Sequence, residues 1–286
     1  MAKGRELKGR IKSVENTRKI TRTMEMVATS KMKRAQDRVA AARPYALALG
    51  DVISSLYNPE LAERFPLLRQ PAQVRRAAVI VLTSNRGLAG AFNANLIKEG
   101  RNLLKRLDGE GVAVDLHVVG RKGLGYFRYI GRDVVSSRTD IGDRPSADDA
   151  RQLVDTLITQ FVDGTLDAVY VVYAKFVSAL STPPTSEQVL PVKPPAQQTR
   201  QKDYLLAPSA DAILTELLPL YVRNTIYRAL VETVAGEQSA RRTAMKNATD
   251  NASEMLNVLR RTYNRARQAQ ITQEIAEIVG GAAALE

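Results

Sequence analysis

The sequence predicts a mixed fold, α/β plus a long coiled coil, in which an α/β domain is inserted between two terminal helices that pair antiparallel. Three observations predict it. Apolar and small residues recur at heptad spacing near the start of the chain and again near its end, and the residues between them alternate between strand-like and helix-like patterns. We expect an N-terminal helix over 1–58, a Rossmann-like α/β domain over 74–195 and a C-terminal helix over 208–286.

The first helix is predicted by alternating steps of four and three residues. Only Arg18, Thr21 and Glu25 interrupt an apolar or small stripe, and heptads sustained over this length indicate a coiled-coil seam. Pro44 removes one backbone donor and should kink or loosen the helix locally. The stripe consists of Leu7, Ile11, Val14, Arg18, Thr21, Glu25, Ala28, Met32, Ala35, Val39, Ala42, Ala46, Leu49, Ile53 and Leu56.

The last helix follows the same steps, and Gly236 is the only glycine between its start and Gly280. A helix this long must pack on something, and the first helix carries the complementary stripe. The second stripe consists of Ile213, Leu217, Leu220, Asn224, Tyr227, Val231, Val234, Gln238, Arg241, Met245, Ala248, Ala252, Met255, Leu259, Thr262, Ala266 and Ala269.

The register of the coiled coil follows from placing the end of the first stripe, Leu56, beside the start of the second, Ile213. Met24 then faces Met245, and Ala35 faces Val234. The first helix runs out before the second does, so roughly the last 20 residues should form a helix without a coiled-coil partner.

The middle of the chain predicts a small, mainly parallel sheet. Apolar strand patterns cover 76–84, 111–120 and 167–177, and amphipathic helix patterns cover 92–107 and 148–162. The proline-rich segment 181–208 is expected to be an irregular return to the last helix.

Composition excludes several classes of function. The chain of 286 residues has no cysteine, which excludes disulfides and zinc–thiolate sites. Its formal charge of +12 predicts an anionic partner. No apolar run reaches the roughly 18 residues that a membrane-spanning helix needs, so none is expected.

Two glycine-containing stretches invite a phosphate-binding interpretation. SNRGLAGAFNANL follows a strand and opens a helix, but it lacks the Gly-Lys-Ser/Thr ending of a P-loop and does not fit GxGxxG. We favour a strand-to-helix turn in which Gly87 and Gly90 supply positive φ angles. GRKGLGYF, at 120–127, is interpreted as another such turn.

No group of residues assembles into a catalytic constellation. His117, the only histidine, lies within an apolar strand pattern and has no cysteine or second histidine as a partner in a metal site. Asp148 and Asp149 are expected in the first turn of a helix, where carboxylates meet the helix dipole favourably. We therefore predict no catalytic residue, no metal site and no cofactor.

Positive charge is concentrated in the first helix. Residues 1–57 contain 13 Lys or Arg and 5 Asp or Glu, and Lys31, Lys33, Arg34 and Arg38 form a cluster. A solvated helix face is the ordinary interpretation of such a run. An RNA-binding arm would be expected to carry stacking aromatic residues, and Tyr45 is the only one before Tyr57.

The final stretch, ITQEIAEIVGGAAALE, is unusually apolar for a chain end. Ile271, Ile275 and Ile278 form one stripe, and small residues follow. Such an end suits insertion into a smooth, close-fitting hole.

Four motifs, MEMVATSKMKRAQ, SNRGLAGAFNANL, AMKNATDNA and ITQEIAEIVGGAA, together resemble the gamma subunit of the F-type ATP synthase. They occur in that family's order and cover essentially the whole chain. The resemblance implies a non-catalytic central rotor shaft, present as a single copy in a hetero-oligomer. Its coiled coil would penetrate the ring of alpha and beta subunits, and its foot would stand on the membrane ring of c subunits, helped by the epsilon subunit.

The resemblance also implies which residues make the contacts. Tyr204 matches an aromatic residue of the foot that faces the c ring, and Ala207 stands where some relatives carry an acid. The positive cluster would meet acidic loops of the beta subunits. The residues implied for the alpha and beta subunits are Met24, Lys31, Lys33, Arg34, Arg38, Arg241, Gln268, Thr272, Glu274 and Glu277.

The expected location is peripheral, on the cytoplasmic face of a bacterial plasma membrane, because there is no chloroplast-type cysteine insert and no transit-like leader. No nucleic-acid partner is expected. Two other classes stay open: a basic coiled-coil protein that binds nucleic acid with steep salt dependence, and a Rossmann-like enzyme that would need a filled cofactor pocket.

Overall fold

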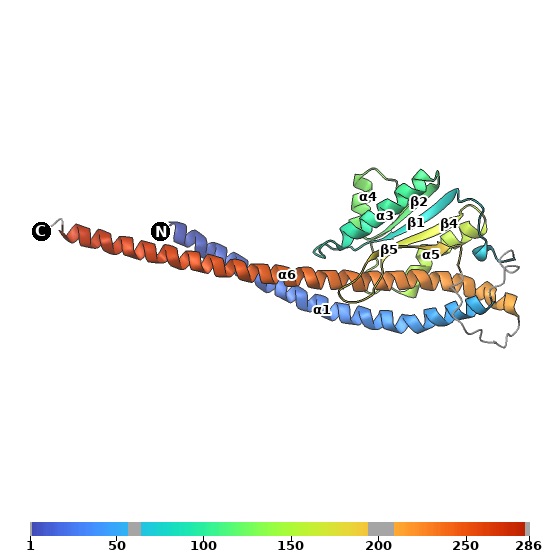
Figure 1. The fold of residues 1–286 in the computed structure, drawn as a ribbon, viewed down its shortest axis with the longest axis horizontal. Coiled ribbons are helices and arrows are strands. Elements are labelled where there is room, and N and C mark those ends of the chain that lie inside the picture. The colour runs from blue at the N-terminus through green and yellow to red at the C-terminus, as the bar shows by residue number, and fades with distance from the viewer. Residues whose placement is uncertain (1, 57–63, 194–208, 284–286) are drawn as a thin grey trace. The chain divides into compact units, whose positions relative to one another are not determined.

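The computed structural model describes residues 2–56, 64–193 and 209–283. The chain forms two compact units, one from 1–28 and 241–286 and the other from 29–240. Two long helices, α1 (Ala2–Leu56) and α6 (Ala210–Ala283), run through both units (Figure 1). Both helices were predicted, and each continues through its internal proline, Pro44 or Pro219.

In the unit formed by 1–28 and 241–286, α1 and α6 pair as predicted. The hydroxyl oxygens of Thr21 and Thr249 lie 2.8 Å apart in the buried seam. Arg260 and Glu15 form an ion pair, with Nη2 and Oε1 3.8 Å apart. The predicted register places Ile20 opposite Thr249, so it is confirmed to within one residue.

The seam of α1 was predicted well, and that of α6 only in part. On α1, every position of the predicted stripe from Leu7 to Leu56 is buried or half-buried. On α6, Met255 and Thr262 are exposed, whereas Leu256 is buried and Tyr263 half-buried. Small residues widen the predicted stripe, so heptad spacing in the sequence fits two sets of positions that differ by one residue. The contact with α1 decides which of the two sets is buried.

In the unit formed by 29–240, the two helices again meet through small and branched residues. Ala35 and Val39 of α1 pack with Val231 and Ala235 of α6 in a buried cluster that also contains Phe176. Side chains of this size let helix axes approach closely.

The same unit contains a five-stranded sheet in the order β3-β2-β1-β4-β5. Its strands are β1 (Arg76–Leu82), β2 (Ala113–Val119), β3 (Ser136–Arg138), β4 (Ala168–Ala174) and β5 (Pro184–Leu190). The first four are parallel, and β5 pairs antiparallel with β4. The three central strands were predicted.

Two edge strands were missed. The segment that contains β5 was expected to be irregular because of its prolines, but Pro184 is the first residue of that strand. A proline is tolerated at the start of an edge strand because no ladder hydrogen bond from its nitrogen is required there. The other edge strand, β3, has three residues, too few for a period to appear in the sequence.

The helices of the insert are α3 (Phe92–Gly109), α4 (Arg121–Tyr129) and α5 (Ala147–Val162), and a 3-10 turn, η1, covers Pro66–Leu68. Helices α3 and α5 were predicted. Asp148 and Asp149 lie in the first turn of α5 as expected, where Ser146 and Asp149 form a capping box.

The stretch GRKGLGYF was interpreted as a strand-to-helix turn, which Gly120 makes between β2 and α4; the rest of the stretch is helical. Gly120 is the N-cap of α4 with φ of 96°, and a Cβ there would lie 2.2 Å from the Thr83 carbonyl oxygen. Only glycine fits this position. Gly123 and Phe127 of α4 are buried, which fixes the helix on the sheet.

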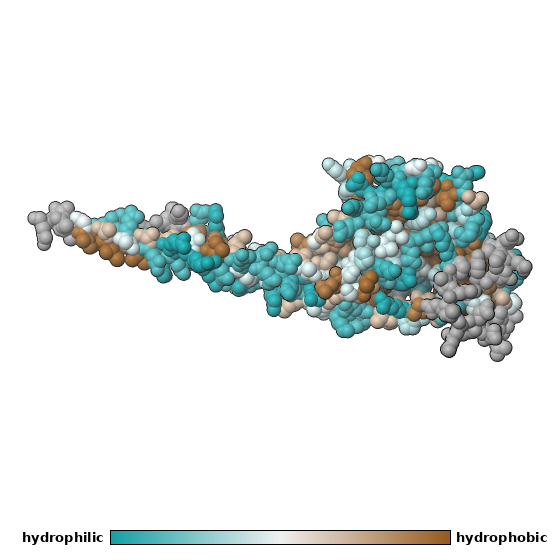
Figure 2. Space-filling view, in the orientation of Figure 1, coloured by the Kyte–Doolittle hydropathy of each residue, from teal (hydrophilic) through white to brown (hydrophobic). Residues whose placement is uncertain are grey.

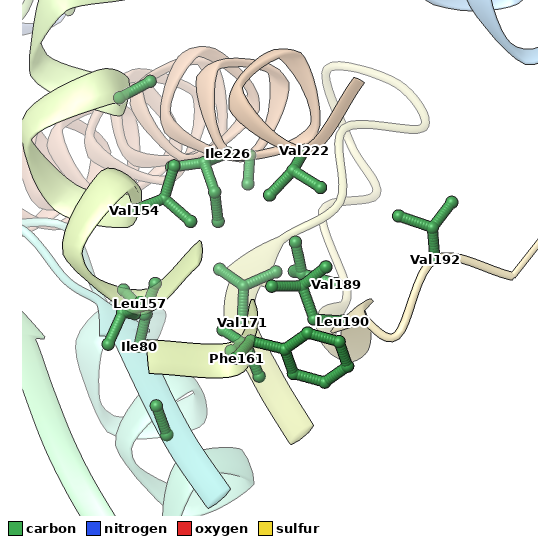
Figure 3. Packing of buried hydrophobic residues seen from close by; sticks show 14 of the residues in the cluster. Ile80, Val154, Leu157, Phe161, Val171, Val189, Leu190, Val192, Val222 and Ile226 are labelled. Carbon is green, nitrogen blue, oxygen red and sulfur yellow. The ribbon is translucent and has the colours of Figure 1, made fainter. Parts of the chain in front are cut away.

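The long helices help to form the core of the insert. One face of the sheet packs against α3 and α4. The other packs against α5 and α6, and Val154 of α5 and Val222 and Ile226 of α6 converge on Val171 and Val189 of the sheet (Figure 3). Leu49 and Ile53 of α1 belong to the same cluster. The insert therefore shares its core with both long helices.

We predict that the variant Thr21→Cys with Thr249→Cys forms a disulfide within one chain on mild oxidation. The two hydroxyl oxygens are already 2.8 Å apart, and a disulfide needs Cα atoms within about 7 Å. Non-reducing mass spectrometry measures the product without interference, because the chain has no cysteine of its own.

The matched control is Thr17→Cys with Thr249→Cys. Thr17 lies one turn away on α1 with its side chain exposed, so this pair should stay reduced. Equal oxidation of both variants would contradict the register.

Candidate functional site

Four cationic residues on α1, Lys31, Lys33, Arg34 and Arg38, form what we call the basic cluster. Lys33 Nζ lies 3.1 Å from Asp37 Oδ1, and both side chains are largely exposed. Arg34 contacts the carbonyl and hydroxyl oxygens of Ser30, one turn back on the same helix. Within the described part of the chain, the partners given for these two residues, Asp37 and Ser30, lie on the same helix.

The other two members of the basic cluster contact the insert. Lys31 Nζ lies 2.5 Å from Asp143 Oδ2, and Arg38 Nη1 donates to the backbone oxygen of Asp143 at 3.1 Å. The loop between β3 and α5 carries Asp143 and brings it beside α1. In the sequence, the four cations are equivalent members of one cluster. In the fold, Lys31 and Arg38 contact the insert, and the other two contact residues of α1.

Met24 and Arg241, both predicted contact residues, lie in the unit formed by 1–28 and 241–286. Met24 is half-buried, and Arg241 is buried with 8% of its surface exposed. Arg241 was also assigned to the predicted seam, and its burial agrees with that assignment. Its role as a contact to another subunit stays a prediction.

The end of α6 from 271 to 280, which we call the tip, has every side chain exposed. Ile271, Ile275 and Ile278 are 47%, 56% and 73% exposed, and they form the apolar stripe predicted from the sequence. Figure 2 shows this apolar surface along the last part of α6. An apolar stripe on an otherwise polar helix marks a surface that another molecule can cover.

Among the described residues, the predicted contact residues of the tip make their hydrogen bonds along their own helix. Thr272 donates to the Gln268 carbonyl oxygen, and Glu274 and Glu277 accept from the side chains of Gln270 and Gln273. Their carboxylates stay at the surface. Tyr204 and Ala207, assigned to the foot, lie outside the described residues.

A partly buried polar network, missed by sequence reasoning, joins α6 to β4 and β5. We call it the strand network; it contains Tyr173, Glu187, Arg228 and Glu232. Arg228 Nη2 donates to both carboxylate oxygens of Glu187 at 2.9 and 3.1 Å, and the Tyr173 hydroxyl donates to Glu187 at 2.7 Å. Burial raises the pKa of Tyr173, and the neighbouring Glu187 carboxylate raises it further.

Glu232 caps a backbone group of the insert. Its Oε2 accepts from the Phe176 N–H at 2.9 Å, and only 6% of the residue is exposed. Burial raises the pKa of this carboxyl group, although the Phe176 N–H and the Arg228 guanidinium favour its charged form. The sequence analysis assigned no role to Arg228 or Glu232, and no local pattern pointed to this network.

The turn after β1 uses its polar groups internally. The backbone N–H and hydroxyl of Ser84 both lie within hydrogen-bonding distance of Asn93 Oδ1. Gly90 has a positive φ of 56° as expected, but Gly87 does not, and Leu88 does instead with φ of 63°. The turn interpretation therefore holds, with Leu88 and not Gly87 in the left-handed region.

His117 occupies a sheet position, as expected. Its Nδ1 lies 2.6 Å from the Ser136 hydroxyl on β3, and burial lowers its pKa. Among the described residues, no group of three or more His, Cys, Asp or Glu is arranged to hold a metal ion. None of the described helices is long and apolar enough to cross a lipid bilayer.

Fold and surfaces together define a class: a two-helix shaft, with an apolar tip and a basic cluster, that carries an α/β domain inserted between its helices. Residues 3–285 match the ATP synthase family. The chain is 70% identical to the ATP synthase gamma chain of Gemmatimonas aurantiaca and 46% identical to that of Moorella thermoacetica, with all of both proteins covered each time. The chain belongs to the ATP synthase gamma chain family.

Solved structures have the same fold. The chain is similar to one from the central stalk and c-ring of Tetrahymena thermophila mitochondrial ATP synthase, with 26% identity, a TM-score of 0.62, and 80% of this chain and 99% of that chain covered. A chain from the OSCP/F1/c-ring structure of the Euglena gracilis enzyme has a TM-score of 0.69 at 19% identity and covers 99% of this chain and 95% of its own length. The second likeness concerns the fold alone.

We predict that Glu232→Ala lowers the free energy of unfolding by about 1–3 kcal/mol, because it leaves the buried Phe176 N–H without its acceptor. Thermal unfolding measures this as a fall in Tm of a few degrees or more. Glu232→Gln retains an acceptor oxygen and should lose less than half as much. Equal losses in the two variants would contradict the capping role.

A comparison of Glu232→Gln with the parent also gives a test that depends on pH. A raised pKa means that the folded protein holds the Glu232 proton more tightly than the unfolded chain does. This contribution to stability is present at low pH and is lost as the pH rises from about 4.5 through the raised pKa. Glu232→Gln has no such proton, so its stability relative to the parent should increase with pH over this window.

Proposed function

We propose that this chain is the central rotor shaft of an F-type ATP synthase and is itself non-catalytic. It couples ion-driven rotation of a membrane c ring to conformational cycling of the alpha and beta subunits. The observation that carries the proposal is the end-to-end identity of 70% with an ATP synthase gamma chain. The paired long helices with an unpaired apolar tip support it, because a shaft that turns in a sleeve needs both.

The proposed contacts are those that the resemblance implies. The tip, with its residues Thr272, Glu274 and Glu277, and the preceding Gln268 meet the alpha and beta subunits, as do Met24, Arg241 and the basic cluster. Electrostatic attraction between the basic cluster and acidic loops of the beta subunits suits a contact that forms and breaks repeatedly. Tyr204 contacts the c ring, helped by the epsilon subunit.

The proposed organisation assigns 1–58 and 208–286 to the shaft and 74–195 to the inserted domain. The proposed location is the cytoplasmic face of a bacterial plasma membrane, where the subunit is peripheral. The bacterial source of the relatives supports this location.

Native mass spectrometry of the complex purified from its own cells tests the proposal. We expect one copy of this chain together with alpha and beta subunits in a complex that hydrolyses ATP. Recovery of the chain without those subunits, bound instead to RNA or DNA in a salt-sensitive manner, would overturn it.

We also predict that Ile275→Glu with Ile278→Glu slows ATP hydrolysis by the assembled complex by tenfold or more. A carboxylate that is buried in an apolar sleeve without a partner costs several kcal/mol, and about 1.4 kcal/mol already corresponds to a factor of ten. Both side chains are exposed in the chain described here, so its own folding should be unchanged by circular dichroism.

The control is Gln273→Glu, which adds negative charge on the opposite face of the same helical segment. It should retain most of the parental rate, because that face already carries polar side chains. A parental rate in the double isoleucine variant would contradict an apolar sleeve around the tip.

A further inference from the structure

Asp143 contacts both long helices from the loop between β3 and α5. Its Oδ2 lies 2.5 Å from Lys31 Nζ of α1, and its Oδ1 accepts from Gln238 Nε2 of α6 at 3.2 Å. Its backbone oxygen accepts from Arg38 Nη1 at 3.1 Å. Asp143 therefore makes two contacts with α1 and one with α6.

The pair between Asp143 and Lys31 is better shielded than the other ion pair in the basic cluster. The side chains of Lys31 and Asp143 are 28% and 36% exposed, whereas those of Lys33 and Asp37 are 72% and 61% exposed. Partial shielding from water strengthens the attraction between opposite charges and reduces its screening by salt. The positive charge of Lys31 is thus largely compensated within the chain.

We propose that Asp143 masks Lys31 and thereby sets how strongly the basic cluster attracts an acidic partner. Lys33, Arg34 and Arg38, whose contact with Asp143 is to a neutral backbone oxygen, then remain the members of the cluster that act on such a partner. Asp143 is a positioning residue in this role, because it acts through Lys31. The inference rests on the proposed function, in which acidic loops of the surrounding subunits meet this part of α1.

The consequence for a rotor is kinetic. Each step must break the contact between the shaft and one acidic loop before the next forms. An additional free cation would stabilise the complex at its resting angle more than it stabilises the transition state between two angles. Stabilisation of the ground state alone slows the step. A masking carboxylate keeps the attraction strong enough to guide the shaft and weak enough to release it.

The test is Asp143→Asn in the complete complex assembled with alpha and beta subunits. Asparagine keeps an oxygen that can accept from Gln238, and Arg38 binds the backbone, so the substitution removes mainly the charge opposite Lys31. We expect ATP hydrolysis to slow several-fold at low ionic strength. The difference from the parent should disappear at high salt, because screening weakens the contact between the freed Lys31 and the partner.

A second substitution separates masking from a structural role. Adding Lys31→Gln to Asp143→Asn removes the unmasked cation and should restore the parental rate at low salt. If Asp143 acts only as a structural tie, the rate or the Tm falls equally at all salt concentrations, and Lys31→Gln gives no rescue. Either of these results would overturn the masking proposal.

Asp140→Asn is the matched control. Asp140 lies in the same loop between β3 and α5, its side chain is 63% exposed, and it pairs with Arg138 within the insert. Removing its charge should therefore leave the rate unchanged at every salt concentration. A slowing in this variant that salt also reverses would show a general charge effect and overturn the assignment to Asp143. Failure of the parental chain to assemble with alpha and beta subunits would overturn the proposed function itself, and the inference with it.

Discussion

The antiparallel pairing of the first and last helices is the constraint on which the rest of the structure depends. Each helix carries a narrow stripe of apolar and small residues that can be buried only against another such stripe. The two stripes meet at Thr21 and Thr249 in one unit and around Ala35 and Val231 in the other. Because the partners come from opposite ends of the sequence, the chain between them must leave the pair and return, which makes the α/β domain an insertion.

The last helix has a second partner, and this explains its irregular burial. Between 229 and 239 every residue except Val234 is buried, because α6 packs on α1 with one side and on the sheet with the other. Polar residues on such a helix need partners inside the protein. Glu232 and Arg228 find them in the Phe176 N–H and in Glu187, so the strand network fixes the position of the insert on the helix as well as satisfying its charges.

The charge that α1 presents at the surface also depends on a contact between distant parts of the chain. In the sequence, a run of four cations on α1 indicates either a solvated helix face or attraction for an anionic partner. In the folded chain, the loop after β3 supplies a carboxylate to Lys31, while Lys33 and Arg34, among the residues that the structure describes, contact neighbours on their own helix. The surface presented to a partner is therefore smaller and more selective than the count of positive residues suggests.

The sequence by itself determined the two long helices, α3 and α5, the three central strands, the register to within one residue and the exposed apolar stripe of the tip. These features arise from local periodicity, which a single segment carries. Tertiary structure alone decided the phase of the α6 seam at Leu256 and Tyr263, the edge strands β3 and β5, the helix after Gly120, and the partners of Lys31 and Glu232. Each of these depends on a contact between residues far apart in the chain, and such a contact produces no periodic pattern in the sequence of either segment.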